Sequence, residues 1–98
     1  MTTITGNVHN PATKQHETEG VVELLHATNA RQCLYSAPID ENGLYSMSGI
    51  DAGSYLLFCS VWSDDKKYCW EIPVTLKDEE TKVHIDLLAD TAQPFEQL

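Results

Sequence analysis

The chain has 98 residues, which is enough for one small domain with a single core and too few for two independent folds. Fifteen acidic residues against six basic ones give a net charge of −9, which repels both phosphate backbones and anionic membrane surfaces. We therefore expect no nucleic-acid partner and, because no apolar run is long enough to span a bilayer, no membrane insertion.

Residues 1–5 lack the basic start and apolar run of a secretory signal. As written, the sequence predicts a cytoplasmic protein, with cell-surface or secreted use if the chain belongs to a larger or specially exported system. We expect a single β-sandwich domain over residues 1–90 and a C-terminal tail over residues 91–98.

Apolar and polar side chains alternate with a period of two along most of the chain, which predicts β-strands and no sustained helix. After strands at 4–10, 20–27 and 32–37, the Asn42-Gly43 step predicts a tight turn, because glycine accepts a positive φ angle. A short strand with Tyr45 and Met47 inward follows, and then strands at 54–62, 68–76 and 81–88. The fold class we expect is all-β, a seven-stranded antiparallel sandwich of two sheets, prealbumin-like or Ig-like.

Several glycine and core positions occur in the order seen in a known family. They are Gly6-x-Val8, Gly20-x-Val22-x-Leu24, Asp40-Glu41-Asn42-Gly43-x-Tyr45 and Ala52-Gly53-x-Tyr55-x-Leu57. In this respect residues 4–88 resemble the carboxypeptidase regulatory-like domains, relatives of the Cna B-type and transthyretin-like sandwiches. The resemblance implies the fold but no single function, because such domains are appended to peptidases, receptors, adhesins and secretion-system proteins.

Resemblance to the enzymatic members of these families would imply functional residues that this chain lacks. The transthyretin-like hydrolases end in Tyr-Arg-Gly-Ser, whereas this chain ends in Phe95-Glu96-Gln97-Leu98 and has Arg31 as its sole arginine. An isopeptide of the Cna B type needs a lysine on the first core strand, and residues 4–10 contain none. We expect no enzyme, no catalytic residues and no cofactor.

Neither the cysteines nor the histidines have the spacing of a metal site. Cys33, Cys59 and Cys69 include no CxxC pair, and the four histidines fit no ligand pattern. We expect reduced thiols and no metal. A Cys59–Cys69 bridge across the hairpin stays open as an alternative, although alternation places Cys69 on the outward face and Cys59 on the inward one.

The strand at 54–62 has apolar residues on both faces. If Tyr55, Leu57, Cys59 and Val61 point inward, the opposite face is more apolar than a solvent-facing surface requires. The strand at 20–27 repeats this pattern. The predicted interface consists of Val21, Leu25, Leu56, Phe58 and Trp62. The alternative is that the N-terminal loop or the tail, with Phe95 and Leu98, covers these residues.

Two classes of function remain. The first is a non-catalytic interaction module that binds protein, either as a homo-oligomer or by docking onto a larger assembly such as a cell-surface or secretion apparatus. The second is a small-ligand or carbohydrate-binding module in which Trp62, Tyr68 or Trp70 stacks on the ligand. The sequence does not identify the partner.

Overall fold

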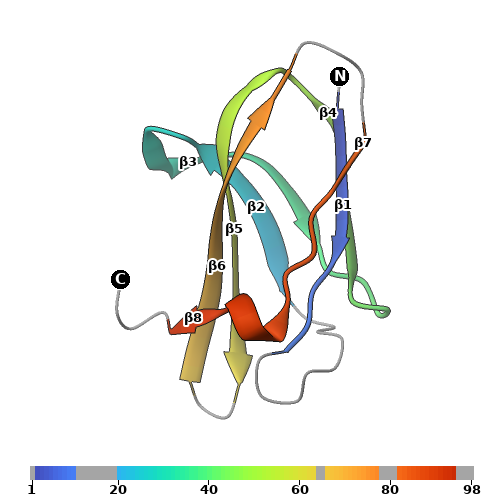
Figure 1. The fold of residues 1–98 in the computed structure, drawn as a ribbon, viewed down its shortest axis with the longest axis vertical. Helices are drawn as coiled ribbons and strands as arrows, with labels where there is room; N and C mark the ends of the chain where they lie inside the picture. The colour runs from blue at the N-terminus through green and yellow to red at the C-terminus, as the bar shows by residue number, and fades with distance from the viewer. Residues whose placement is uncertain (1, 11–19, 64–65, 78–81, 95–98) are drawn as a thin grey trace.

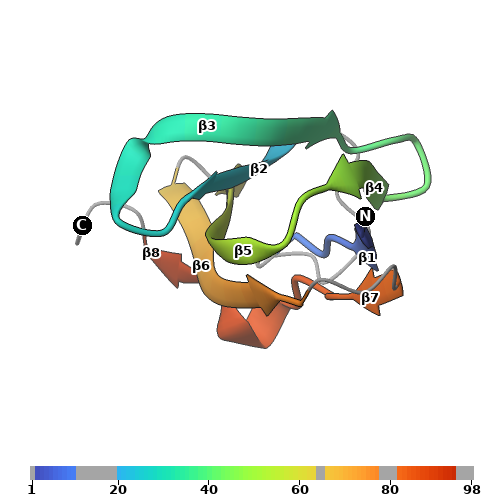
Figure 2. The ribbon, with the colours of Figure 1, turned by 90° about the horizontal axis from the view of Figure 1, so that it is seen from above.

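Two packed β-sheets form the molecule, as Figures 1 and 2 show from the side and from above. The computed structural model describes residues 2–10, 20–63, 66–77 and 82–94. The elements are β1 (Thr2–Asn7), β2 (Val21–His26), β3 (Asn29–Pro38), β4 (Leu44–Ile50), β5 (Gly53–Ser63), β6 (Lys66–Leu76), β7 (Lys82–His84), the 3₁₀ helix η1 (Ala89–Thr91) and β8 (Gln93–Pro94). No helix among these residues is long and apolar enough to cross a membrane.

The sheet order confirms an all-β sandwich of two sheets. One sheet has the order β4-β1-β7 and the other the order β3-β2-β5-β6-β8. Strands form in all seven expected regions, although the last, expected over residues 81–88, spans only Lys82–His84, and β8 adds a two-residue eighth. One pairing differs from the antiparallel arrangement that we expected, because β7 runs parallel to β1. The chain crosses from one sheet to the other between β6 and β7, so β7 joins β1, a strand far away in the sequence, and no hairpin imposes an antiparallel pairing on the two.

Side chains from both sheets fill the space between the layers. The residues predicted inward on β5 are all buried, and the expected inward positions Val22, Leu24 and Met47 are buried as well. The core cluster contains Ile4, Val8, Val22, Leu24, Ala37, Ile39, Tyr45, Met47, Ile50, Tyr55, Leu57, Cys59, Val61, Trp70, Val74, Leu76 and Leu87. Burial of this apolar surface is the main force that holds the sheets together.

The Asn42-Gly43 turn forms as predicted. Gly43 has a φ angle of 75°, and its amide donates to the carbonyl oxygen of Asp40 at 3.0 Å. The Asp40 carboxylate accepts from the amides of Asn42 and Leu44 at 2.8 and 2.9 Å. A side chain that satisfies two backbone donors fixes the approach to β4.

Gly6 allows β1 and the segment after β7 to lie in close contact. A β-carbon at this position would overlap the carbonyl oxygen of Ile85, so any other residue would force the two backbones apart. The same carbonyl oxygen accepts a hydrogen bond from the Tyr45 hydroxyl at 2.6 Å. Burial, followed by the nearby Asp86 carboxylate, raises the pKa of Tyr45, which keeps this hydroxyl a donor.

The sandwich extends further along the chain than the expected domain boundary at residue 90. The indole nitrogen of Trp70 donates to the carbonyl oxygen of Leu88 at 3.0 Å, and Gln93 pairs with Cys69. Residues 93–94, which we placed in a tail, are therefore part of the five-stranded sheet. Residues 95–98, with the proposed covering side chains Phe95 and Leu98, lie outside the described residues.

Candidate functional site

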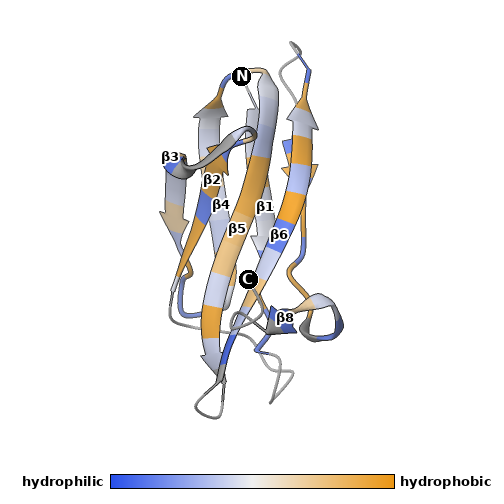
Figure 3. Ribbon diagram, turned by 90° about the vertical axis from the view of Figure 1, so that its left-hand side faces the viewer, coloured by the Kyte–Doolittle hydropathy of each residue, from blue (hydrophilic) through white to orange (hydrophobic). Residues whose placement is uncertain are grey.

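Strand pairing places the residues of the predicted interface on the outward side of the five-stranded sheet, whose strands are coloured by hydropathy in Figure 3. Strand pairing places alternate residues of three neighbouring strands on this side. We call the surface the outer face and define it by ten residues, namely Val21, Glu23 and Leu25 of β2, Leu56, Phe58, Ser60 and Trp62 of β5, and Lys67, Cys69 and Glu71 of β6.

Among the apolar residues of the outer face, exposure is greatest toward the end where β5 and β6 form their hairpin. Trp62 and Val21 are 66% and 47% exposed, while Leu56 and Phe58 are half-buried. Leu25 is buried, so it does not offer the contact surface that we predicted for it. Its register explains the difference: the β2–β3 pairing is irregular on both sides of Leu25, and Leu25 lies between Cys33 and Leu56. Irregular pairing bends a strand locally and changes what its neighbours cover.

A row of three residues crosses the middle of the outer face. Phe58 pairs with Glu23 on one side and with Glu71 on the other. Glu71 is exposed and Glu23 is half-buried. Phe58 therefore lies between two glutamates whose backbones are two strand spacings apart, about 10 Å at the usual spacing of about 4.8 Å per strand.

A cation lies at the hairpin end of the same face. Lys67 is paired with Trp62, and its Nζ atom lies 6.0 Å from the centre of the Trp62 ring. This distance is at the limit of a cation–π contact, which at an exposed site contributes about 0.5 kcal/mol. The indole ring remains largely accessible to a partner.

Prolines occur in β3, an outermost strand of this sheet, and in the part of β6 that β8 does not cover. Pro38 ends β3, and Pro73 lies in β6 beyond the two residues that pair with β8. Because proline has no N–H to donate, it hinders the addition of another strand at an edge. A partner of this sheet is therefore expected to contact a face.

Cys59 and Cys69 lie on the sides of the sheet that we predicted for them, but the outward Cys69 is not exposed. Cys59 lies in the core and Cys69 on the outer face, so a bridge between them would have to cross the sheet. Cys69 is nevertheless fully buried, beside β8, and burial raises the pKa of its thiol. All three cysteines are free. Partial burial, then the Glu23 carboxylate, raises the pKa of Cys33.

The structure does not bring the three candidate stacking residues together. Trp70 is 2% exposed and packs in the core, which corrects its prediction as a ligand platform. Tyr68 is half-buried and pairs with Val61, so alternation places it on the side opposite Trp62, where it packs against the core. Of these residues only Trp62 presents an open ring face.

A second polar region, which the sequence analysis did not identify, lies on the three-stranded sheet. The Thr5 hydroxyl lies 3.3 Å from Nδ1 of His84, and Nε2 of His84 lies 2.8 Å from the Asp86 carboxylate. The amide of Asn7 donates to the same carboxylate at 2.9 Å, and this bond is the main reason why the pKa of Asp86 is lowered. The signal was the polar alternation of Lys82, His84 and Asp86, but the sequence did not show that this stretch pairs with β1.

Next to this network lies a hollow of about 450 Å³. Its walls combine hydroxyl, imidazole and carboxylate groups with apolar surface. It is lined by Thr5, Gly6, Pro38, Asp40, Leu44, Tyr45, Ser46 and His84. Most of this lining is apolar, with a few polar groups among it, which is the usual composition of a small-molecule site.

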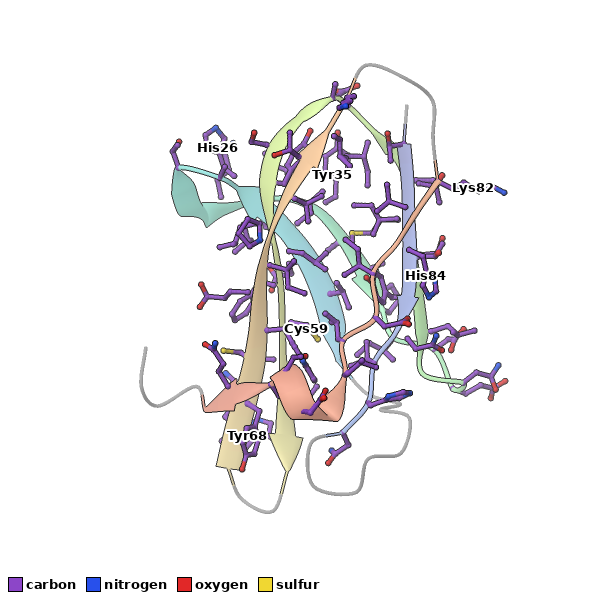
Figure 4. The ribbon with its side chains drawn as sticks, viewed as in Figure 1. His26, Tyr35, Cys59, Tyr68, Lys82 and His84 are labelled. Atoms are coloured by element: carbon purple, nitrogen blue, oxygen red, sulfur yellow. The ribbon has the colours of Figure 1, made fainter. Side chains whose placement is uncertain are left out.

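Two of the four histidines, His26 and His84, lie far apart (Figure 4). His26 and His84 are at opposite sides of the molecule in Figure 4, and His16 lies outside the described residues. Within the described part of the chain, no three His, Cys, Asp or Glu side chains gather as metal ligands would.

Comparisons identify the fold as a prealbumin-like β-sandwich. The structure is similar to 5-hydroxyisourate hydrolase from Klebsiella pneumoniae, with a TM-score of 0.61, 14% identity and 97% of both chains covered. It is also similar to BcpA, the major pilin subunit of Bacillus cereus, in the D312A variant, with a TM-score of 0.57, 19% identity and 90% of this chain covered. This chain spans 30% of that pilin.

A third similar structure is a candidate carbohydrate-binding protein from Pseudomonas aeruginosa, with a TM-score of 0.55, 19% identity and 86% of both chains covered. Neither a family model nor a curated protein matches the sequence. At these identities the likenesses show the fold alone.

Proposed function

We propose that this protein is a non-catalytic interaction module of the carboxypeptidase regulatory-like type, which docks onto another protein through the outer face. The observation that carries the proposal is the exposed apolar surface of Val21 and Trp62, with the half-buried Phe58 on the same face of the sheet. Contiguous apolar side chains on such a scaffold mark protein interfaces, since their burial contributes roughly 25 cal/mol per Å² before the costs of association.

Two further features support docking through a face. The prolines at positions 38 and 73 disfavour strand addition at the edges, and the pilin neighbour is by name the subunit of an assembly. The half-buried Phe58 lies outside the core cluster, so a polar substitution there changes the surface more than the interior.

The test is to select binders from a library of displayed helical miniproteins and to measure their affinity for variants. We expect Val21→Asp and Phe58→Asp to remain folded by circular dichroism and to weaken the selected binders at least tenfold, because each places a charge in the contact. Leu44→Asp is the matched control, since Leu44 is 42% exposed and lies on β4.

Binders that keep their affinity for both outer-face variants would contradict the proposal. An unfolded Phe58→Asp protein would show that Phe58 belongs to the interior, and Val21→Asp then decides the question alone. Light scattering over a dilution series distinguishes a second copy of this chain from a different partner protein.

The hollow beside β1, β4 and β7 favours a second candidate function, which is binding of a small polar ligand. Its hydroxyl and imidazole groups offer hydrogen bonds to sugar hydroxyls. A glycan panel followed by nuclear magnetic resonance tests it. Ligand-induced shifts centred on Thr5, Ser46 and His84 would support this function, and unchanged spectra with every glycan would reject it.

A further inference from the structure

Glutamates on both sides of Phe58 constrain what can cover the outer face. We infer that, if the proposed function holds, the partner is a basic amphipathic helix of another protein. This helix has one cationic side chain on each side of an apolar region. The inference rests on the row Glu23, Phe58, Glu71, which strand pairing aligns across β2, β5 and β6.

The chemistry of the row gives the charge of the partner. An apolar group that covers Phe58 also brings its neighbours close to both glutamates and removes water from them. A carboxylate that loses water without gaining a partner is costly, whereas a lysine or arginine opposite it forms a charge-assisted hydrogen bond. The chain's net charge of −9 acts in the same direction, because it steers basic partners toward the protein.

The spacing of the row gives the shape of the partner. The glutamates lie two strand spacings apart, about 10 Å. A helix rises about 1.5 Å per residue, so side chains at i and i+7 are about 10.5 Å apart on one face, with i+3 and i+4 between them. The pattern Lys-x-x-Leu-Leu-x-x-Lys therefore matches the row.

Symmetry disfavours a second copy of the chain as the occupant. A two-fold axis through Phe58, directed along the strands or along the row, places the glutamates of one copy against those of the other. Like charges opposed in an interface are repulsive and reject the wrong partner. Lys67, the face's one basic side chain, lies by Trp62 and away from this row.

The experiment uses a synthetic helical peptide with the pattern Lys-x-x-Leu-Leu-x-x-Lys and a matched peptide with glutamate in place of both lysines. Binding to the full chain is measured by titration calorimetry. We expect the lysine peptide to bind and the glutamate peptide not to bind. The double variant Glu23→Gln with Glu71→Gln should weaken binding about tenfold, which corresponds to two partly exposed ion pairs of about 0.7 kcal/mol each.

The control pair Glu41→Gln with Asp90→Asn removes the same charge outside the outer face. An equal loss with this pair would mean that net charge alone attracts the peptide, and it would overturn the inference. If Glu23→Gln disturbs the fold, Glu71→Lys alone should still weaken binding by more than the control does.

The remaining outcomes separate the inference from the proposed function. If both peptides bind equally and Val21→Asp weakens both, the docking face stands and the basic partner is wrong. If neither peptide binds, the inference fails, while the binders selected above still test the docking face. A dimer that Val21→Asp dissociates would make a second copy the occupant and also overturn the inference.

Discussion

Asp86 shows how one side chain links stability to pH. Its carboxylate accepts from the backbone amide of Asn7, which lowers the pKa of Asp86 in the folded state. A group with a lowered folded-state pKa stabilises the fold above its unfolded value of about 3.9. This stabilisation is lost as the pH falls through the folded-state pKa.

We therefore expect Asp86→Asn to lower the free energy of unfolding at pH 7 by about 0.5 kcal/mol, a small effect because solvent screens this partly exposed group. The difference from the unsubstituted protein should shrink as the pH falls below about 3.9 and vanish once Asp86 is protonated in the folded state. Urea unfolding at pH 7 and over a series of acidic pH values measures it. Asp90→Asn, which removes a charge on η1, is the control, and a deficit that persists unchanged in acid would contradict the hydrogen-bond account.

The reactivity of the three thiols tests whether a disulfide joins Cys59 and Cys69 across the hairpin. Cys33 is exposed, while Cys59 and Cys69 are buried on opposite sides of the hairpin. We expect one thiol to react rapidly with Ellman's reagent in the native protein and all three in denaturant without reductant. One reactive thiol in denaturant would instead show a Cys59–Cys69 bridge.

At the scale of elements, the close contact between β1 and the segment after β7 depends on Gly6. Its missing side chain admits the carbonyl oxygen of Ile85, whereas Gly49 has open space around it and a φ angle of 70°. Substitution of the two glycines therefore separates a steric effect from a conformational one.

We expect Gly6→Ala to reduce the free energy of unfolding by at least about 3 kcal/mol, because it forces two backbones apart. Gly49→Ala should cost about 1 kcal/mol, the usual penalty for placing a β-carbon in the left-handed region. Urea unfolding ranks the two variants. Equal losses would show that the backbones at Gly6 tolerate separation.

The strand pairings show which features of the fold the sequence predicted and which it did not. Alternation located the strands and the inward face of β5, since a half-buried strand must alternate. It did not give the parallel pairing of β7 with β1, which depends on a crossover between sheets. It also missed the burial of Leu25 and Cys69, because irregular pairing and the neighbouring β8 depend on distant parts of the chain.

For the whole molecule, the two outward surfaces differ in how far the sequence revealed them. The outer face was visible as a second apolar stripe on β5, although Leu25 of the neighbouring strand proved to be buried. The network of Thr5, His84 and Asp86 was not visible, because residues 79 positions apart meet only after β7 joins β1. Local alternation predicts faces, and only the assembled sheets show which side chains share one.

The proposed function requires the outer face to be the docking surface. The most direct measurement is a nuclear magnetic resonance titration of the labelled protein with the lysine peptide. We predict that the shifted amide signals cluster on β2, β5 and β6 around Glu23, Phe58 and Glu71. Shifts that cluster instead around Thr5, Ser46 and His84 on the opposite sheet would contradict it.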